Sequence, residues 1–150
     1  MIVVADRAIL GTARRATLAT IAPDGRPRLV PVCFVVLGDL FWSPLDEKPK
    51  SVDDPRRLAR VRDIERDARV TLLVDRWSED WAELAWLRLD GHAETVESAD
   101  AAIIAALRAK YPQYVDHDLE SRPMIRITIE RAARWEPPGA SGPGQATRNE

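Results

Sequence analysis

Several features are scarce in this chain of 150 residues. It has one cysteine, Cys33, so no disulfide can form within the chain. No apolar run approaches the roughly 20 residues that a membrane-spanning helix needs. The first residues carry no charged-then-apolar leader. We therefore expect a soluble, cytoplasmic protein with no membrane partner.

A basic excess and a metal-ligand pattern are also missing. The formal net charge is -2, whereas a dedicated nucleic-acid binder normally shows a strong excess of lysine and arginine. The two histidines, His92 and His117, have no second histidine or cysteine at ligand spacing. We therefore expect neither a nucleic-acid partner nor a bound metal ion.

Lysine is rare, and its placement is informative. Of three lysines, Lys48 and Lys50 stand together in a proline-containing loop after an apolar run. A lysine ammonium is a compact charge with three donors, and the arginines that follow, Arg57 among them, add planar guanidinium groups for the same anion. The stretch therefore predicts a phosphate site that includes Ser51. The alternative is a loop whose lysines are simply solvated.

The hydrophobic pattern is mostly that of strands. Short branched runs separated by turn residues predict strands over residues 16–21, 28–37, 40–43, 69–74, 85–96 and 124–129, with a bulge at Gly91. Helical spacing predicts a helix in the first dozen residues, a second after Asp53 or Asp54 with Leu58, Val61 and Ile64 on one face, and a third from a Ser98 cap to Lys110. Six or seven antiparallel strands with two or three covering helices indicate a small, mainly β (α+β) barrel, since closure removes exposed edges.

The chain shows no repeat and no linker between domains. Residues 1–136 are expected to form one domain. Residues 137–150 are rich in Pro, Gly, Ser and Gln and predict a flexible tail, because such a segment cannot bury enough apolar area to order itself.

An ordered series of motifs runs along the chain: Ala16-Thr-Leu-Ala-Thr, Asp24-Gly-Arg-Pro, Val30-Pro-Val-Cys-Phe34, Lys48-Pro-Lys50, Leu58-Ala-Arg-Val-Arg-Asp-Ile64 and Asp67 to Asp75. This series resembles a known family, the split β-barrel flavin and deazaflavin oxidoreductases related to pyridoxamine phosphate oxidase. Later segments, at 80–81, 86–91 and 110–114, look most like the coenzyme F420-dependent branch. The resemblance extends to residue 136. Asp63 departs from it, because this branch often has asparagine there, and the change would reduce any contact with an anionic tail.

The resemblance implies a homodimer with two equivalent sites between its subunits. Each site would hold a tricyclic cofactor, F420 or alternatively FMN, that transfers a hydride to a planar conjugated small molecule. Because the cofactor performs the chemistry, no catalytic side chain is expected. The cofactor-binding residues expected are Val32, Cys33, Phe34, Trp42, Ser43, Pro44, Lys48, Lys50, Ser51, Arg57 and Trp77.

Other interpretations of single residues stay open. Trp77 lies in a polar loop, where a large aromatic side chain favours a partner subunit or a flat ligand over the core of its own protomer. The other tryptophans are first of all core or interface residues. A non-catalytic protein that holds a flavin, a deazaflavin or haem is the competing class, and His92 would then be the haem ligand. Cys33, within a buried run, is typical of a small apolar filler.

Overall fold

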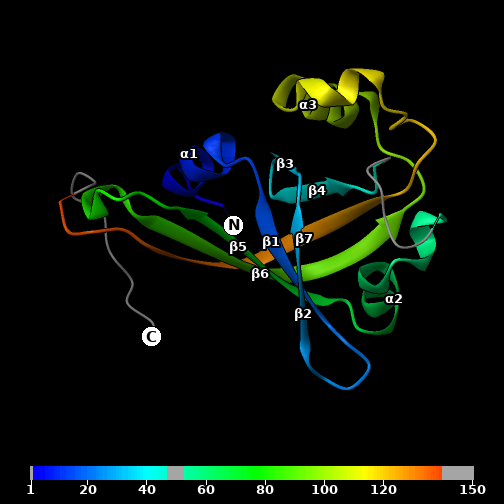
Figure 1. Ribbon diagram of the computed structural model, residues 1–150, viewed down its shortest axis with the longest axis horizontal. Helices are drawn as coiled ribbons and strands as arrows, with labels where there is room; N and C mark the ends of the chain where they lie inside the picture. Colours follow the sequence, from blue (N-terminus) through cyan, green and yellow to red (C-terminus); the bar gives the residue numbers. More distant parts are fainter. Residues whose placement is uncertain (1, 47–52, 140–150) are drawn as a thin grey trace.

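The computed structural model describes residues 2–46 and 53–139 and contains one antiparallel sheet of seven strands in the order β2-β1-β5-β6-β7-β4-β3 (Figure 1). The expected mainly β, α+β split-barrel class is confirmed. The strands are β1 (Ala16–Ile21), β2 (Pro27–Val32), β3 (Val35–Leu37), β4 (Leu40–Pro44), β5 (Arg69–Arg76), β6 (Ala85–Val96) and β7 (Met124–Trp135). The helices are α1 (Val4–Thr12), α2 (Ala59–Arg66) and α3 (Ala101–Lys110), with short 3-10 turns at Pro55–Arg57, Trp81–Glu83 and Pro112–Asp116.

The step from β2 to β3 is what splits the barrel. Only Cys33 and Phe34 separate these two strands, yet they stand at opposite ends of the sheet order. The prediction of one strand over residues 28–37 is therefore wrong. The physical reason is a long-range contact: the backbone N–H of Phe34 donates to the hydroxyl of Tyr111 at 3.0 Å, and the ring of Phe34 stacks on Phe41 in the interior.

Strand β6 has the predicted bounds and the predicted bulge. Its register against β7 shifts between Asp90 and Gly91. A Cβ added to Gly91 would lie 2.2 Å from the carbonyl oxygen of Thr128, so glycine permits a close backbone approach there. The expected faces are also confirmed, with Leu87 and Leu89 buried and His92 exposed.

Two apolar clusters hold the structure. The larger fills the barrel and includes the predicted helix face of Leu58, Val61 and Ile64. The smaller lies under α3, where Ile103, Ile104 and Leu107 pack against Val35, Trp42, Tyr111, Tyr114, Leu119 and Met124. The predicted Ser98 cap is wrong, because α3 starts at Ala101 with Asp100 before it. No helix in the described ranges is both long and apolar enough to cross a bilayer.

Candidate functional site

The two strand segments predicted to border the cofactor do lie together. Val35 pairs with Trp42 across β3 and β4, and Oγ of Ser43 donates a hydrogen bond of 2.8 Å to the carbonyl of Cys33. The side chains of Phe34 and Trp42 are core residues, however, with Trp42 only 6 % exposed. Val32, Ser43 and Pro44 are buried as well, so Cys33 is the one position of this group that is partly exposed within a protomer.

Two tyrosines that sequence reasoning missed, Tyr111 and Tyr114, hold the chain around these strand segments. The hydroxyl of Tyr111 accepts from the backbone N–H of Phe34 at 3.0 Å. The hydroxyl of Tyr114 donates a 2.5 Å hydrogen bond to Oδ2 of the buried Asp46. Burial and this bond to the carboxylate both raise the pKa of Tyr114. Arg122 donates to the carbonyls of Leu45 and Asp46 at 2.7 and 2.9 Å. The chain is thus held firmly at Asp46, just before the segment that carries Lys48, Lys50 and Ser51, which lies outside the described residues.

Positive charge gathers where the described chain resumes. Asp54 accepts from the backbone N–H of Arg56 at 3.0 Å and so begins the 3-10 turn in which Arg57 is exposed. Arg60 is partly buried, and among the described residues its Nε finds no acceptor. Burial lowers the pKa of Arg60, and the nearby charge of Asp46 opposes that shift. A partly buried guanidinium N–H that has no acceptor among the described residues is a suitable hydrogen-bond donor for an anionic ligand.

A second candidate surface is a groove of about 450 Å³ beside the loop that joins β5 and β6. It is lined by Leu73, Asp75, Arg76, Trp77, Leu84, Ala85, Trp86, Arg88 and Trp135. Trp77 is 70 % exposed, and the guanidinium of Arg88 lies 5.9 Å from the ring centroid of Trp86. Three indole rings and guanidinium groups around one groove suit a flat conjugated ring.

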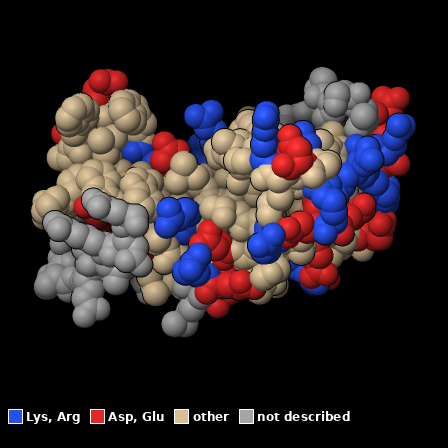
Figure 2. Space-filling view, turned by 90° about the horizontal axis from the view of Figure 1, so that it is seen from below, with Lys and Arg blue, Asp and Glu red and all other residues tan. Residues whose placement is uncertain are grey.

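The groove and the basic segment, by which we mean the residues around Arg57 and Arg60, lie at opposite ends of β6. Trp86 stands at the start of this strand, whereas Arg56 forms an ion pair with Glu97, just after its end. Twelve residues at about 3.3 Å each span more than 30 Å. Figure 1 shows α2 at one end of the molecule and the β5–β6 connection at the other, and in Figure 2 charged side chains crowd the end that carries α2. Trp77 and Arg57 of one protomer are thus too far apart to contact the same ring system.

Asp63, where the sequence departs from the F420 branch, is buried and fully engaged. It accepts from Oγ1 of Thr20 at 2.8 Å and from Nε of Arg28 at 2.7 Å, and Arg66 lies 3.3 Å away. Burial raises its pKa, but the hydrogen bonds from Arg28, Thr20 and Arg66 outweigh burial, so the pKa lies below its usual value. Its negative charge is therefore balanced within the protomer.

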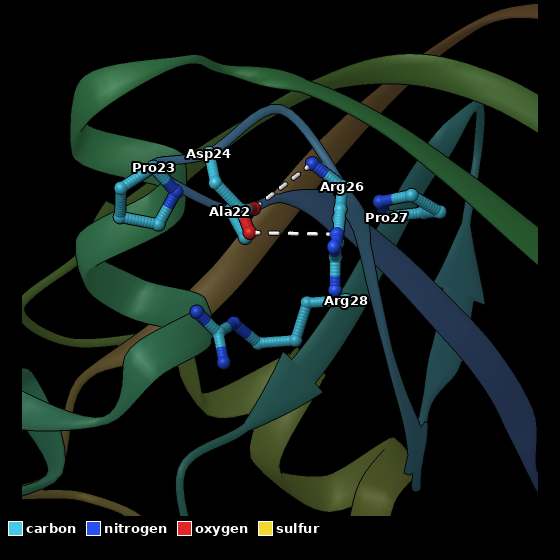
Figure 3. A pocket seen from close by; sticks show the side chains of 6 residues that line it. All are labelled: Ala22, Pro23, Asp24, Arg26, Pro27 and Arg28. Atoms are coloured by element: carbon cyan, nitrogen blue, oxygen red, sulfur yellow. Dashed lines mark hydrogen bonds and ion pairs between the residues drawn. The ribbon is translucent and has the colours of Figure 1, made fainter.

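A hollow of about 470 Å³ at the β1–β2 turn is a weaker candidate (Figure 3). Asp24 accepts from the backbone N–H of Arg26 at 3.1 Å and closes the turn. The side chain of Arg28 runs away from the turn toward α2, where it pairs with Asp63. Of the two arginines that line the hollow, only Arg26 is therefore a cation directed toward solvent.

His92 is the residue that the competing, haem-holding class of protein would use as its haem ligand. The described residues contain no group of three or more His, Cys, Asp or Glu side chains that could hold a metal ion. His92 is exposed and its Nδ1 contacts the carboxylate of Glu130. Cys33 is partly buried.

Comparisons with known proteins agree with this fold. A family model described as pyridoxamine 5'-phosphate oxidase matches residues 4–136. A conserved hypothetical protein of Mycobacterium tuberculosis is structurally similar at 23 % identity and a TM-score of 0.72, covering 99 % of this chain and 94 % of that one. An F420 reductase is similar at 18 % identity and a TM-score of 0.65, covering 85 % and 94 %. The haem storage protein HutZ of Vibrio cholerae is similar at 17 % identity and a TM-score of 0.65, covering 87 % and 90 %. No curated protein matches the sequence.

Proposed function

Because this chain belongs to the pyridoxamine 5'-phosphate oxidase family, we propose that it is an oxidoreductase that binds the deazaflavin coenzyme F420 and reduces a planar conjugated small molecule. The F420 reductase among its structural neighbours supports this choice of cofactor. FMN in the same site is the alternative, since both cofactors combine a tricyclic ring with a phosphate.

The observation that carries the proposal is the separation of the two halves of the site. The basic segment with Arg57 and Arg60 suits the anionic tail, and the groove with Trp77 suits a flat ring, but they lie at opposite ends of β6. A twofold homodimer can bring the groove of one protomer to the basic segment of the other. The exposed side chains of Leu29 on β2 and Leu73 on β5, the two strands that flank β1, would be covered in such a dimer.

The residues present fit the cofactor chemically. Nε of Arg60, which has no acceptor among the described residues, and the exposed guanidinium of Arg57 would hold the anionic tail beside Lys48, Lys50 and Ser51. The backbone near Cys33 and Ser43 would border the ring. When bound, the cofactor supplies the hydride, while the protein binds it, orients it and excludes water.

Mixing two deficient variants tests the shared site. Lys50→Ala removes charge from one half and Trp77→Ala removes the indole from the other, so each homodimer should bind F420 weakly. In a mixed dimer, one site receives both defects and the other receives neither. We expect refolded mixtures to regain tight binding in up to half of the sites of each mixed dimer, measured by deazaflavin fluorescence.

Three outcomes would count against the proposal. If mixing restores nothing although mass spectrometry shows mixed dimers, the site does not combine these residues from two protomers. If the protein binds F420 but never oxidises the reduced form with any conjugated acceptor tested, it is a cofactor-holding protein rather than an enzyme. Light scattering that shows a monomer at micromolar concentration would remove the shared site altogether.

A further inference from the structure

A separate pocket lies between helices α1 and α3. Both helices sit on the same side of the sheet with β3 between them (Figure 1). The pocket has a volume of about 320 Å³. Its lining is Arg7, Leu10 and Gly11 from α1, Val35, Val36 and Leu37 from β3, and Ala106 and Lys110 from α3. The proposed cofactor site uses none of these side chains.

Lys110 is a partly buried cation in the wall of this pocket. Its Nζ donates to the carbonyl of Leu10 at 3.1 Å and lies 3.7 Å from the ring centroid of Phe34. No carboxylate of the described ranges 2–46 and 53–139 pairs with it. Burial, followed by the positive charge of Arg14, lowers the pKa of Lys110 to about 8. The nearby Cys33 opposes this shift only in part. A partly buried charge without a carboxylate partner is costly, so this ammonium favours an added anion.

The other charged groups described around the pocket, Arg7 and Arg14, are cations, so neither neutralises Lys110. Arg7 lies in the same wall, but it is occupied by the carbonyl of Gly38 at 2.9 Å and by Asp39 at 3.3 Å. Arg14, which follows α1, donates to the carbonyl of Lys110 at 2.7 Å and adds positive charge nearby. Apart from these cations, the lining is aliphatic or glycine.

We propose that this pocket binds a small apolar monocarboxylate, with its carboxylate at Lys110 and its apolar part against Val35, Val36 and Leu37. The aliphatic floor would shelter the apolar part from water. The volume stands at the small end of the range of about 300–1,000 Å³ that ligand pockets occupy, which favours a ligand of the size of octanoate. A carboxylate is the occupant that both neutralises the lysine and leaves the aliphatic lining dry.

Octanoate and octan-1-ol are matched probes, because they share the tail and differ in charge. Calorimetry at pH 7 should give octanoate at least about tenfold tighter binding than octan-1-ol, which is the effect of one charge-assisted contact. Lys110→Met should weaken octanoate binding by about tenfold and leave octan-1-ol unchanged. Lys110→Arg should restore most of the affinity for octanoate.

A second variant separates the pocket from the charge. Ala106→Phe should fill the pocket and weaken both probes while leaving Lys110 in place, and it keeps the test valid if Lys110→Met fails to fold. Equal affinities of the wild-type protein for octanoate and octan-1-ol would overturn the proposal. Octanoate binding that Ala106→Phe leaves unchanged would overturn it as well.

Discussion

Arg28 and Asp63 join strand β2 to helix α2 through a hydrogen bond of 2.7 Å between Nε of Arg28 and Oδ2 of Asp63. The same oxygen accepts from Thr20 in β1, so one buried carboxylate connects the first hairpin to the helix. The resemblance to the F420 branch predicted that aspartate here would reduce any contact with an anionic tail. Because Arg28 and Arg66 both pair with this carboxylate, its charge is balanced locally, and its effect on the tail stays a prediction.

Removing this charge should destabilise the fold. At pH 7 we expect Asp63→Asn to lower the free energy of unfolding by about 1.5–3 kcal/mol, the usual contribution of a hydrogen bond to a charged group. Urea unfolding followed by tryptophan fluorescence measures it. Asp67→Asn is the matched control, because Asp67 pairs with Arg69 at the exposed end of α2, and its effect should be much smaller. Equal urea midpoints for Asp63→Asn and the wild type would contradict the structural role.

The difference between Asp63→Asn and the wild type should also depend on pH. The pKa of Asp63 is below its usual value of 3.8, because its hydrogen bonds outweigh the effect of burial. Its stabilising contribution is therefore complete above that value and is lost as the pH falls through the lower pKa of the folded state. Unfolding free energies of the two proteins should converge between pH 4 and pH 2, and a constant difference over that range would be evidence against the assignment.

Gly91 should resist substitution. An alanine Cβ at this position would lie 2.2 Å from the carbonyl oxygen of Thr128, so the backbone of β6 or β7 must move. We expect Gly91→Ala to cost about 1–3 kcal/mol of stability. Gly11→Ala is the matched control in helix α1, where a Cβ meets nothing within 4 Å, and it should stabilise the protein by about 0.5–1 kcal/mol. Thermal unfolding of both variants tests the contrast, which fails if Gly91→Ala melts at or above the wild-type temperature.

Strands with a complete local pattern could be predicted from the sequence. Strand β6 alternates apolar and polar residues over its whole length, and its glycine marks the bulge, so both were found. Residues 28–37 were joined into one strand because their branched residues run on without a turn signal. The break depends on Tyr111, whose hydroxyl takes the N–H of Phe34 from 77 positions away in the chain. A contact between residues so far apart in the chain leaves no signal in the local sequence pattern.

The candidate site was harder to predict than the fold. Trp77 was expected to be exposed because its neighbours are polar, and it is. The Tyr114–Asp46 bond and the unpaired Nε of Arg60 were missed, because an aspartate in a loop and an arginine in a basic helix look solvated in sequence. Asp46 is covered by Tyr114 from the turn Pro112–Asp116, and Arg60 is partly buried where α2 packs against β1 and β6.

Lys110 should give the protein an alkaline increase in stability. The pKa of this lysine is lowered to about 8 from its ordinary 10.5. Between these values the unfolded chain binds a proton that the folded protein has released, so stability rises with pH over this window. We expect a gain of about 1–2 kcal/mol between pH 7.5 and 10.5, which is less than the roughly 1.4 kcal/mol per pKa unit of a fully buried group, because Lys110 is only partly buried and solvent screens its charge. The unfolding free energy of Lys110→Met should not rise over this pH range. Identical pH profiles of stability for the variant and the wild type would show that burial does not lower the pKa of Lys110.

The cofactor preference should depend on salt and on the lysine segment. Several cations around Arg57 and Arg60 exceed what one phosphate requires, so we expect F420 to bind more tightly than FMN, with a gap that narrows as salt screens the exposed charges. Lys50→Ala, and less clearly Lys48→Ala, should cost about 1.5–3 kcal/mol of binding, which is roughly ten- to a hundredfold in affinity. Calorimetry measures the affinities, and circular dichroism checks that both variants fold. Two folded variants with unchanged affinity would mean that these lysines are only solvated, and equal binding of F420 and FMN at low salt would remove the deazaflavin assignment.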